Sequence, residues 1–453
     1  MATPKGDMTS MRQPPATRLG DLARLALPLA GSTLLVTASE IADRAFLGHW
    51  SEEALAAALS GGMLANVFTG VLAGTVGYAS AFVSRFLGAD REEEAITAFA
   101  QGLWLAIFSL PVFLVAIPIG LTLIDSAGHV ETLRLHERAY FLFVLARGAF
   151  TTFAAALGAW FIGRGQTGCV ARATVVGCGI NLLTAPLFIF SLGLGVAGAG
   201  ASAVLASATT CLVLLGPLRR DFRARPMSAG TWLRLQPTEI GRLLRAGLPF
   251  GLSSLIGSTT FTAFVLTLGR MDVSALAVGT ACFAVNNFFY TLLAAVETAL
   301  MIRTGQALGE GNEDDIRRFL RTGLALDLIL FGVFFGIVLC FTNATLAPFA
   351  GSADATARAM FLERGRPFMT ILAVAGVFRA MQSAFTGHLR GRGDTRRIFC
   401  AQTIASLFVW MPLVALALSL KLPATALFAT FPIQIAVNAA LLAARPLTSY
   451  SPR

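Results

Sequence analysis

Three ionisable residues stand close together inside an otherwise apolar stretch of this chain. Glu40, Asp43 and Arg44 lie near the end of the first long apolar run, which begins near Leu22. A charge at membrane depth is costly, so an acid inside a run of spanning length is by default a candidate functional residue. Counting about 1.5 Å per residue along a helix leaves both acids within a hydrocarbon half-thickness of about 15 Å, Asp43 only just. The alternative is that Asp43 and Arg44 already lie among the outer headgroups.

The chemistry open to such acids is reversible cation binding. A carboxylate in a cleft can be neutralised by a proton, by a sodium ion or by a cationic organic molecule. If one of these ligands lowers the affinity for another, each displaces the other by the same factor. Glu297 is a further candidate, six residues before Arg303 and roughly 9 Å above the inner end of its run, where it either takes part in binding or pairs with a neighbouring arginine.

Arginines inside apolar runs need acidic partners. Arg147 lies 17 residues before Arg164, roughly 25 Å above the inner loop and at the depth of Glu40 and Asp43. We therefore expect Arg147 to pair with one of these acids, with Arg44 joining to make a neutral cluster. The alternative is that Arg147 extends to the outer headgroups and contacts neither acid.

Two charged residues of the second half carry separate expectations. Arg379 falls near the middle of its run, and Glu297 is the best candidate for its partner. Asp327 lies six residues past Arg321, at a depth similar to that of Glu297, and is expected to be structural.

The elements that must position these residues are membrane-spanning helices. Of 453 residues, 55% are hydrophobic and only 13% charged, the composition of a polytopic membrane protein. Each of twelve apolar runs is long enough to cross the bilayer as a helix. The predicted spans are 22–48, 54–84, 96–124, 139–163, 173–193, 195–218, 246–269, 275–302, 322–350, 367–389, 398–420 and 422–444.

The basic residues predict the topology. With the N-terminus in the cytoplasm, the inner segments hold 25 Lys and Arg residues and the outer loops 7, and the other three lie within spans. This bias follows the positive-inside rule and predicts that both termini are cytoplasmic. The net charge of +10 is therefore a topology signal, and nucleic acid is not an expected partner.

The chain also repeats itself. Leu-Pro and Leu-Gly pairs recur at an offset of 221 residues, and the sequence GRGQT at 163–167 returns as GRGDT at 391–395. The chain is therefore expected to be all-α, with twelve transmembrane helices in two six-helix lobes related by a pseudo-two-fold axis along the membrane normal. The predicted segments are a tail at 1–21, lobes at 22–218 and 246–444, a basic linker at 219–245 and a tail at 445–453.

Enzyme chemistry has little support. The six cysteines form no CxxC pair and the four histidines no HExxH, so neither a disulfide nor a metal site is expected. The GxGD sequence ending at Asp394 matches intramembrane aspartyl proteases, but it lies in an arginine-rich inner loop without a second acid. No phosphate-binding glycine loop is present. We predict neither an enzyme nor an organic cofactor.

Several motifs together resemble the multidrug and toxic compound extrusion (MATE) family. The sequence from Asp43 to Gly48, followed by a turn and ALAA, resembles its first-span signature. Residues 86–94 resemble the turn after the second span, and residues 163–167 the loop after the fourth. Asn181 opens a stretch that resembles the fifth-to-sixth-span signature. The resemblance extends from about Ala23 to Ala443 and rests on the order and spacing of the motifs.

The resemblance implies roles for single residues and also has gaps. It makes Asp43 an ion-coupling or substrate residue and raises Asn181, otherwise a polar contact between helices, to a possible ligand. Two carboxylates that some relatives carry are missing, because Ala185 follows the fifth-span Asn and Gly257 and Ser258 stand in the seventh span. The coupling ion cannot be inherited by analogy.

These observations predict a secondary transporter. It would be a monomer in the bacterial inner membrane that exports amphipathic, cationic organic compounds in exchange for H⁺ or Na⁺ by alternating access. Some aromatic residues are expected to line the cleft between the lobes, where they could hold organic cations. The alternative is a flippase for a lipid-linked sugar, which would favour a cleft lined by Arg44, Arg147 and Arg379.

Overall fold

The structure is a computed structural model that describes residues 18–126, 130–223, 234–349 and 355–444. Within these residues, twelve helices are long and apolar enough to cross a membrane, which confirms the predicted number of spans. The predicted tails at 1–21 and 445–453 lie outside the described residues, except for 18–21, as does the middle of the predicted linker.

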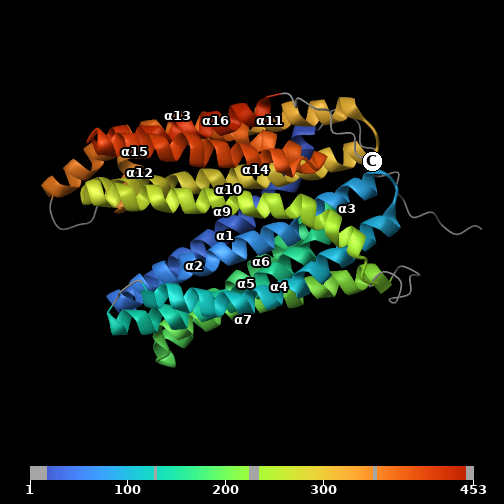
Figure 1. Cartoon of the computed structure of the whole chain (residues 1–453), viewed down its shortest axis with the longest axis horizontal. Coiled ribbons are helices and arrows are strands. Elements are labelled where there is room, and N and C mark those ends of the chain that lie inside the picture. The colour runs from blue at the N-terminus through green and yellow to red at the C-terminus, as the bar shows by residue number, and fades with distance from the viewer. Residues whose placement is uncertain (1–17, 127–129, 224–233, 350–354, 445–453) are drawn as a thin grey trace, which may run out of the picture.

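The first half of the chain forms six spans (Figure 1), here called the N-lobe. Its elements are α1 (Arg18–Trp50), α2 (Glu52–Gly77), α3 (Ala79–Gly88), α4 (Glu92–Ser126), α5 (Glu131–Gly163), α6 (Thr167–Pro186), the π-helical turn η3 (Leu187–Ser191) and α7 (Gly195–Arg223). The second and third helices share one span, and η3 completes the span that α6 begins.

The second half forms the other six spans, the C-lobe. Its elements are α9 (Pro237–Met271), α10 (Val273–Gly309), α11 (Glu313–Cys340), the short α12 (Thr342–Leu346) and η4 (Ala347–Phe349), α13 (Ala355–Arg392), α14 (Thr395–Thr403), η5 (Ile404–Trp410), α15 (Met411–Ser419) and α16 (Ala424–Ala443). The stretch from α14 to α15 is one span, interrupted by the π-helical η5.

Many helices extend well beyond the apolar runs that predict them. The seventh span begins at Pro237 instead of residue 246, and the tenth continues to Arg392 instead of residue 389. Polar and charged residues can continue a helix into the headgroup layer because water is available to them there. The described parts of the predicted linker 219–245 are accordingly mostly helical, within α7 and α9.

Corresponding turns of the two halves share backbone conformations, in agreement with the sequence repeat. Six of the seven left-handed residues in the described part of the chain, all but Gly195, occur in pairs at the offsets found in the sequence, 221 or 228 residues. The second span of each half also begins with a side-chain N-cap. The pairs are Asp90 and Gly311, Gly165 and Gly393, and Gly193 and Lys421, and the caps are Ser51 and Asp272. A short polar side chain that accepts a hydrogen bond from the first turn starts both helices in the same way. The pseudo-two-fold axis itself stays a prediction.

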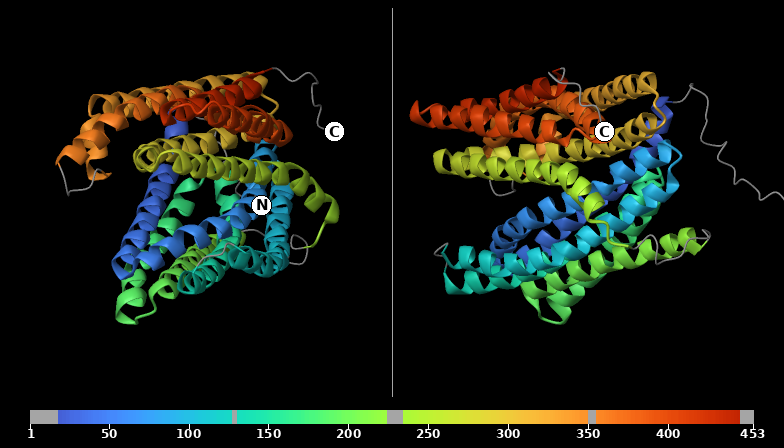
Figure 2. Two further views of the ribbon diagram at one scale, coloured as in Figure 1. Left: turned by 60° about the vertical axis from the view of Figure 1, so that its left-hand side comes forward. Right: turned by 45° about the vertical axis from the view of Figure 1, so that its right-hand side comes forward.

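The two lobes meet at one end of the molecule and diverge toward the other (Figures 1 and 2). The meeting end holds the turns after α3 and α10 and is the end predicted to be cytoplasmic, so we call it the inner end. A hydrophobic cluster from both lobes fills it, with residues from the start of α1, from the junction of α2 and α3, from α3 and from α10. We call this contact the seam. The members of its cluster are Leu22, Leu25, Ala26, Ala30, Tyr78, Ala81, Ala295, Val296, Ala299, Met301 and Ile302.

Glycines bring the backbones of the two lobes together along the seam. A Cβ atom added to Gly247 would lie 2.5 Å from the carbonyl oxygen of Thr75, and one added to Gly88 would lie 2.1 Å from that of Gln306. Across a membrane interface, such small residues provide attraction through close van der Waals packing. One ion pair, between Asp21 and Arg303 at 3.9 Å, also joins the lobes at this end.

Candidate functional site

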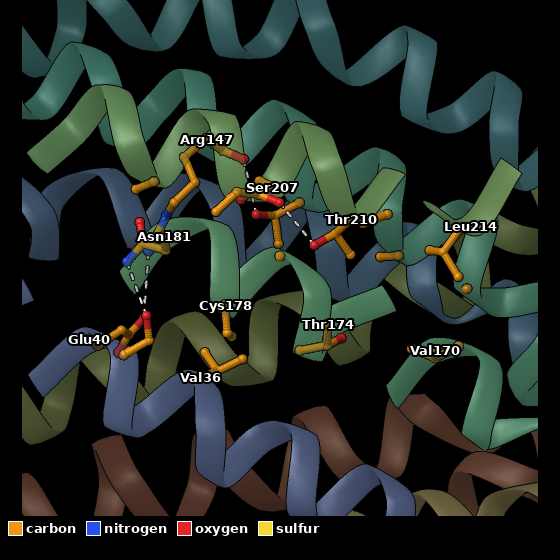
Figure 3. Close-up of a pocket in the computed structure, with 18 of the residues that line it drawn as sticks. Val36, Glu40, Arg147, Val170, Thr174, Cys178, Asn181, Ser207, Thr210 and Leu214 are labelled. Atoms are coloured by element: carbon orange, nitrogen blue, oxygen red, sulfur yellow. Dashed lines mark hydrogen bonds and ion pairs between the residues drawn. The ribbon is translucent and has the colours of Figure 1, made fainter. Parts of the chain in front are cut away.

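A cavity of about 390 Å³ lies inside the N-lobe, between α1, α5, α6 and α7 (Figure 3). Its walls are made mainly of small and hydroxyl-bearing side chains, with the predicted acids at one end. No aromatic ring is among the described residues that line it, so the aromatic lining predicted for the cleft between the lobes does not extend to this cavity. The polar lining residues are Ser39, Glu40, Asp43, Arg147, Thr151, Thr174, Cys178, Asn181, Ser207 and Thr210.

Asp43 and Asn181 are bound to each other at the end of this cavity. The Asn181 Nδ2 donates to Asp43 Oδ1 at 2.9 Å and to Oδ2 at 2.8 Å, and it lies 3.0 Å from the Ser39 Oγ. The Ser202 Oγ donates to the Asn181 Oδ1 at 3.1 Å, which turns the amide NH₂ group toward the carboxylate. The Asp43 residue is 9% exposed. It therefore faces the interior of the N-lobe and not the outer surface of that lobe.

Arg147 pairs with Glu40, as predicted. Its Nη1 lies 3.6 Å from the Glu40 Oε1, and its Nη2 donates to the Asn66 Oδ1 at 3.1 Å. Glu40 is 44% exposed, so this is a loose, partly solvated pair at the mouth of the cavity and not a buried bridge.

Arg44 does not join these residues, so the neutral four-residue cluster that we predicted is wrong. Its side chain is exposed and makes no ion pair with any described residue. Consecutive helical residues point about 100° apart, so the turn that directs Asp43 inward directs Arg44 away. The cavity thus holds two acids and one arginine, and Asp43 has an amide partner instead of a cation.

The predicted pair of Arg379 and Glu297 is also wrong. Glu297 binds Arg390 at 2.8 Å, close to the inner end of α13 and twelve residues before the end of α10. Arg379 donates to the Gln382 Oε1 at 3.0 Å and lies over the Tyr290 ring, 4.6 Å from its centroid. Eleven residues separate the two arginines on α13, roughly 16 Å of helix, so only Arg390 reaches the depth of Glu297. The expectation of an inner acid paired with an arginine is confirmed, with a different arginine.

The cavity walls were missed in the sequence, although a signal for them exists. On α6, Thr174, Gly177, Cys178 and Asn181 line the cavity at helical spacing, and α7 contributes residues 203, 206, 207, 210 and 214 in a similar pattern. Residues at i, i+3, i+4 and i+7 share one helix face. A stripe of small and hydroxyl side chains in an apolar span indicates a face that does not contact lipid, and here two such stripes face each other.

Comparisons with known proteins agree with the motifs. The family model described as MatE matches residues 28–187 and 249–416, more than half of the chain. A relative from Burkholderia vietnamiensis, named multidrug resistance protein NorM, is 27% identical over 394 residues, which cover 84% of this chain and 83% of the relative. A mutant of the Vibrio cholerae MATE transporter VcmN has the same fold, with a TM-score of 0.85 at 17% identity over 94% of this chain and 95% of that one. A structure described as the outward-facing conformation of a multidrug resistance MATE family transporter covers 97% of this chain and 96% of its own, with a TM-score of 0.82 at 20% identity.

Proposed function

Because the chain belongs to the MatE family, that of multidrug and toxic compound extrusion transporters, we propose that it is a secondary active efflux transporter. It exports amphipathic, cationic organic compounds in exchange for H⁺ or Na⁺. The observation that carries this proposal is the cavity of the N-lobe, with Asp43 at its end and no cation paired to that carboxylate.

The charges of the cavity residues support a site that exchanges one cation for another. Arg147 is engaged with Glu40, so an ionised Asp43 leaves the cavity one negative charge in surplus. A proton, a sodium ion or a cationic substrate can each neutralise that charge, and binding of one weakens binding of the others. Asn181 and Ser39 offer neutral polar atoms that can change hydrogen-bond partners when any of these three ligands binds.

The arrangement of the lobes supports alternating access. The seam closes the inner end while the lobes diverge at the other end (Figure 2), which corresponds to an outward-facing state if the termini are cytoplasmic. Separating the lobes at the seam while their outer ends approach each other would open the inner end and close the outer one. In this proposal the protein acts as a monomer in the inner membrane, with both termini and the segment 219–245 in the cytoplasm and without nucleic acid as a partner.

The alternative as a flippase for a lipid-linked sugar is not favoured. It requires several arginines around one cleft to bind a pyrophosphate. Arg44 faces outward, Arg147 is paired with Glu40, and Arg379 belongs to the other lobe, where it binds Gln382.

Efflux of a fluorescent organic cation from proteoliposomes tests the proposed function. A proton gradient and a sodium gradient are imposed separately, with ATP absent. Export driven by one gradient alone supports the proposal and identifies the ion. The proposal fails if neither gradient drives movement of the cation in either direction, while control vesicles confirm that both gradients persist.

A further inference from the structure

One acid of the C-lobe has no role in the site described above. Asp327 lies on α11, outside the cavity, and is fully buried at 0% exposure. Neither of its carboxylate oxygens has a hydrogen-bond partner among the described residues. An ionised carboxylate without partners is among the costliest groups to bury, whereas a protonated one is far less so.

One hydroxyl group lies near this carboxyl group, and its hydrogen is directed to another acceptor. The Ser383 hydroxyl of α13 lies beside it, but that hydroxyl gives its hydrogen to the backbone carbonyl of Leu293 on α10, at 3.1 Å. Ser383 therefore offers Asp327 only oxygen lone pairs. A carboxylate cannot use them, but a carboxylic acid can donate to them. While its hydrogen is directed to Leu293, Ser383 gives an ionised Asp327 no donor.

The charged groups on the helices around Asp327 are mostly committed elsewhere. Glu297 on α10 acts on Asp327 as a like charge and is itself bound to Arg390 of α13. Arg303 on α10 pairs with Asp21 of α1, and Arg379 donates to Gln382. The short α12 carries no ionisable side chain. The other titratable or charged groups on the packed elements are Cys282, Tyr290, Arg358, Glu363, Arg364, Arg366, His388 and Arg392 on α10 and α13, and Arg18, Arg24, Glu40, Asp43, Arg44 and His49 on α1.

The position of Asp327 ties it to the seam. Leu326, which precedes Asp327, and Leu330, about one helical turn after it, both pack against the seam cluster. The helix α11 also contacts α1 of the other lobe. Opening the seam would separate these helices and admit water toward Asp327 from the inner end. The burial that makes an ionised Asp327 costly therefore depends on the seam being closed.

We propose that Asp327 is a second proton-binding site, which holds one proton while the seam is closed and releases it to water at the inner end when the seam opens. The inference rests on the proposed function only for the existence of an open-seam state. Because proton binding and seam closure are linked, each favours the other by the same factor. Raising the pH therefore favours opening, with a shift in the equilibrium of up to about tenfold per pH unit for one proton.

Distances between two spin labels at the inner end test this linkage without measuring transport. The labels are attached at Glu93→Cys in the N-lobe and Asp314→Cys in the C-lobe, which are exposed positions related by the offset of 221, in a full-length chain with its six native cysteines replaced. The protein is held in lipid nanodiscs and titrated from acidic to alkaline pH, also in an Asp43→Asn background to remove the cavity acid. We expect the label distance to lengthen as the pH rises.

Three variants decide the interpretation. Asp327→Asn, which cannot lose a proton, should stay closed across the titration. Ser383→Ala, which removes the neighbouring hydroxyl and leaves the carboxyl group in place, should keep the pH-dependent transition. Asp125→Asn, which removes an exposed N-lobe carboxylate paired with Arg138, should titrate like the parent and serves as the control.

The outcomes separate this inference from the proposed function. The inference is overturned if the Asp327→Asn variant opens with rising pH as the parent does. This outcome counts when the variant is monodisperse and has the same label distance as the parent at acidic pH. It also fails if the seam of the parent opens when the fluorescent organic cation is added but never when the pH rises. In that case the proposed alternating access remains supported. A seam that opens under neither condition overturns both.

Discussion

Replacing Gly88 with alanine should force the seam apart. An added Cβ would lie 2.1 Å from the carbonyl oxygen of Gln306 and 2.7 Å from its carbonyl carbon and Cα, whereas ordinary van der Waals contact begins near 3.4 Å. These are backbone atoms, so relief requires the two lobes to separate locally by about 1 Å. Overpacking of this kind costs about 1–3 kcal/mol. Because the strain exists only in the closed state, it should favour the open state by roughly 5- to 150-fold.

The spin-label pair at positions 93 and 314 measures this shift as the fraction of open molecules at an acidic pH at which the parent is closed. Gly241→Ala on α9 is the matched control, because no atom lies within 4 Å of its added Cβ. It gains helix propensity, worth up to about 1 kcal/mol, without a clash. If Gly88→Ala and Gly241→Ala show the same closed fraction, then the seam is not held by backbone contact at this point and the reasoning fails.

Three further predictions concern the cavity and the topology. Asp43→Asn should abolish gradient-driven efflux from proteoliposomes while leaving the thermal unfolding transition in place, and full efflux by this variant would contradict the role of the carboxylate. Ser207→Trp should fill the cavity and weaken binding of a fluorescent cation at least tenfold, or by about 1.4 kcal/mol, whereas Leu212→Trp on an exposed face of α7 should bind like the parent. A Ser228→Cys probe in the background without native thiols should resist an impermeant reagent in intact cells, and labelling there would show that the predicted topology is inverted.

The sequence was sufficient for the features that depend on distance along one helix. Twelve apolar runs become twelve spans, and Arg147 meets Glu40 because counting residues places both at one depth. Family motifs marked Asp43 and Asn181 separately as candidate site residues, but their contact was not predicted, since nothing in the sequence alone brings the fifth span beside the first. The sequence repeat reappears in turns whose left-handed residues recur in pairs, a backbone feature that was not predicted.

The wrong predictions concern the direction in which a side chain points from its helix and the residue at which a helix ends. Arg44 was assigned to a cluster from spacing alone, although it lies 100° around the helix from Asp43. Arg390 was counted as a loop residue and a topology signal, but α13 continues to Arg392, and that extension lets it bind Glu297. Neither the cavity inside one lobe nor the burial of Asp327 could be predicted, because both depend on which helices are lateral neighbours.

The glycines of α9 place its contact with the N-lobe nearer to the inner end of the helix than to the outer end. At Gly247 and Gly251, the backbone of α9 packs closely on the backbone of α2 in the N-lobe. By helical rise, this contact lies about 15 Å from the inner end of α9 at Pro237 and about 30 Å from its outer end at Met271. A stiff helix that pivots at this fulcrum is a lever with an outer arm roughly twice as long as the inner arm. Each ångström by which the inner end opens should therefore move the outer end by about two, so a small release at the inner end closes the outer mouth before the inner passage is wide.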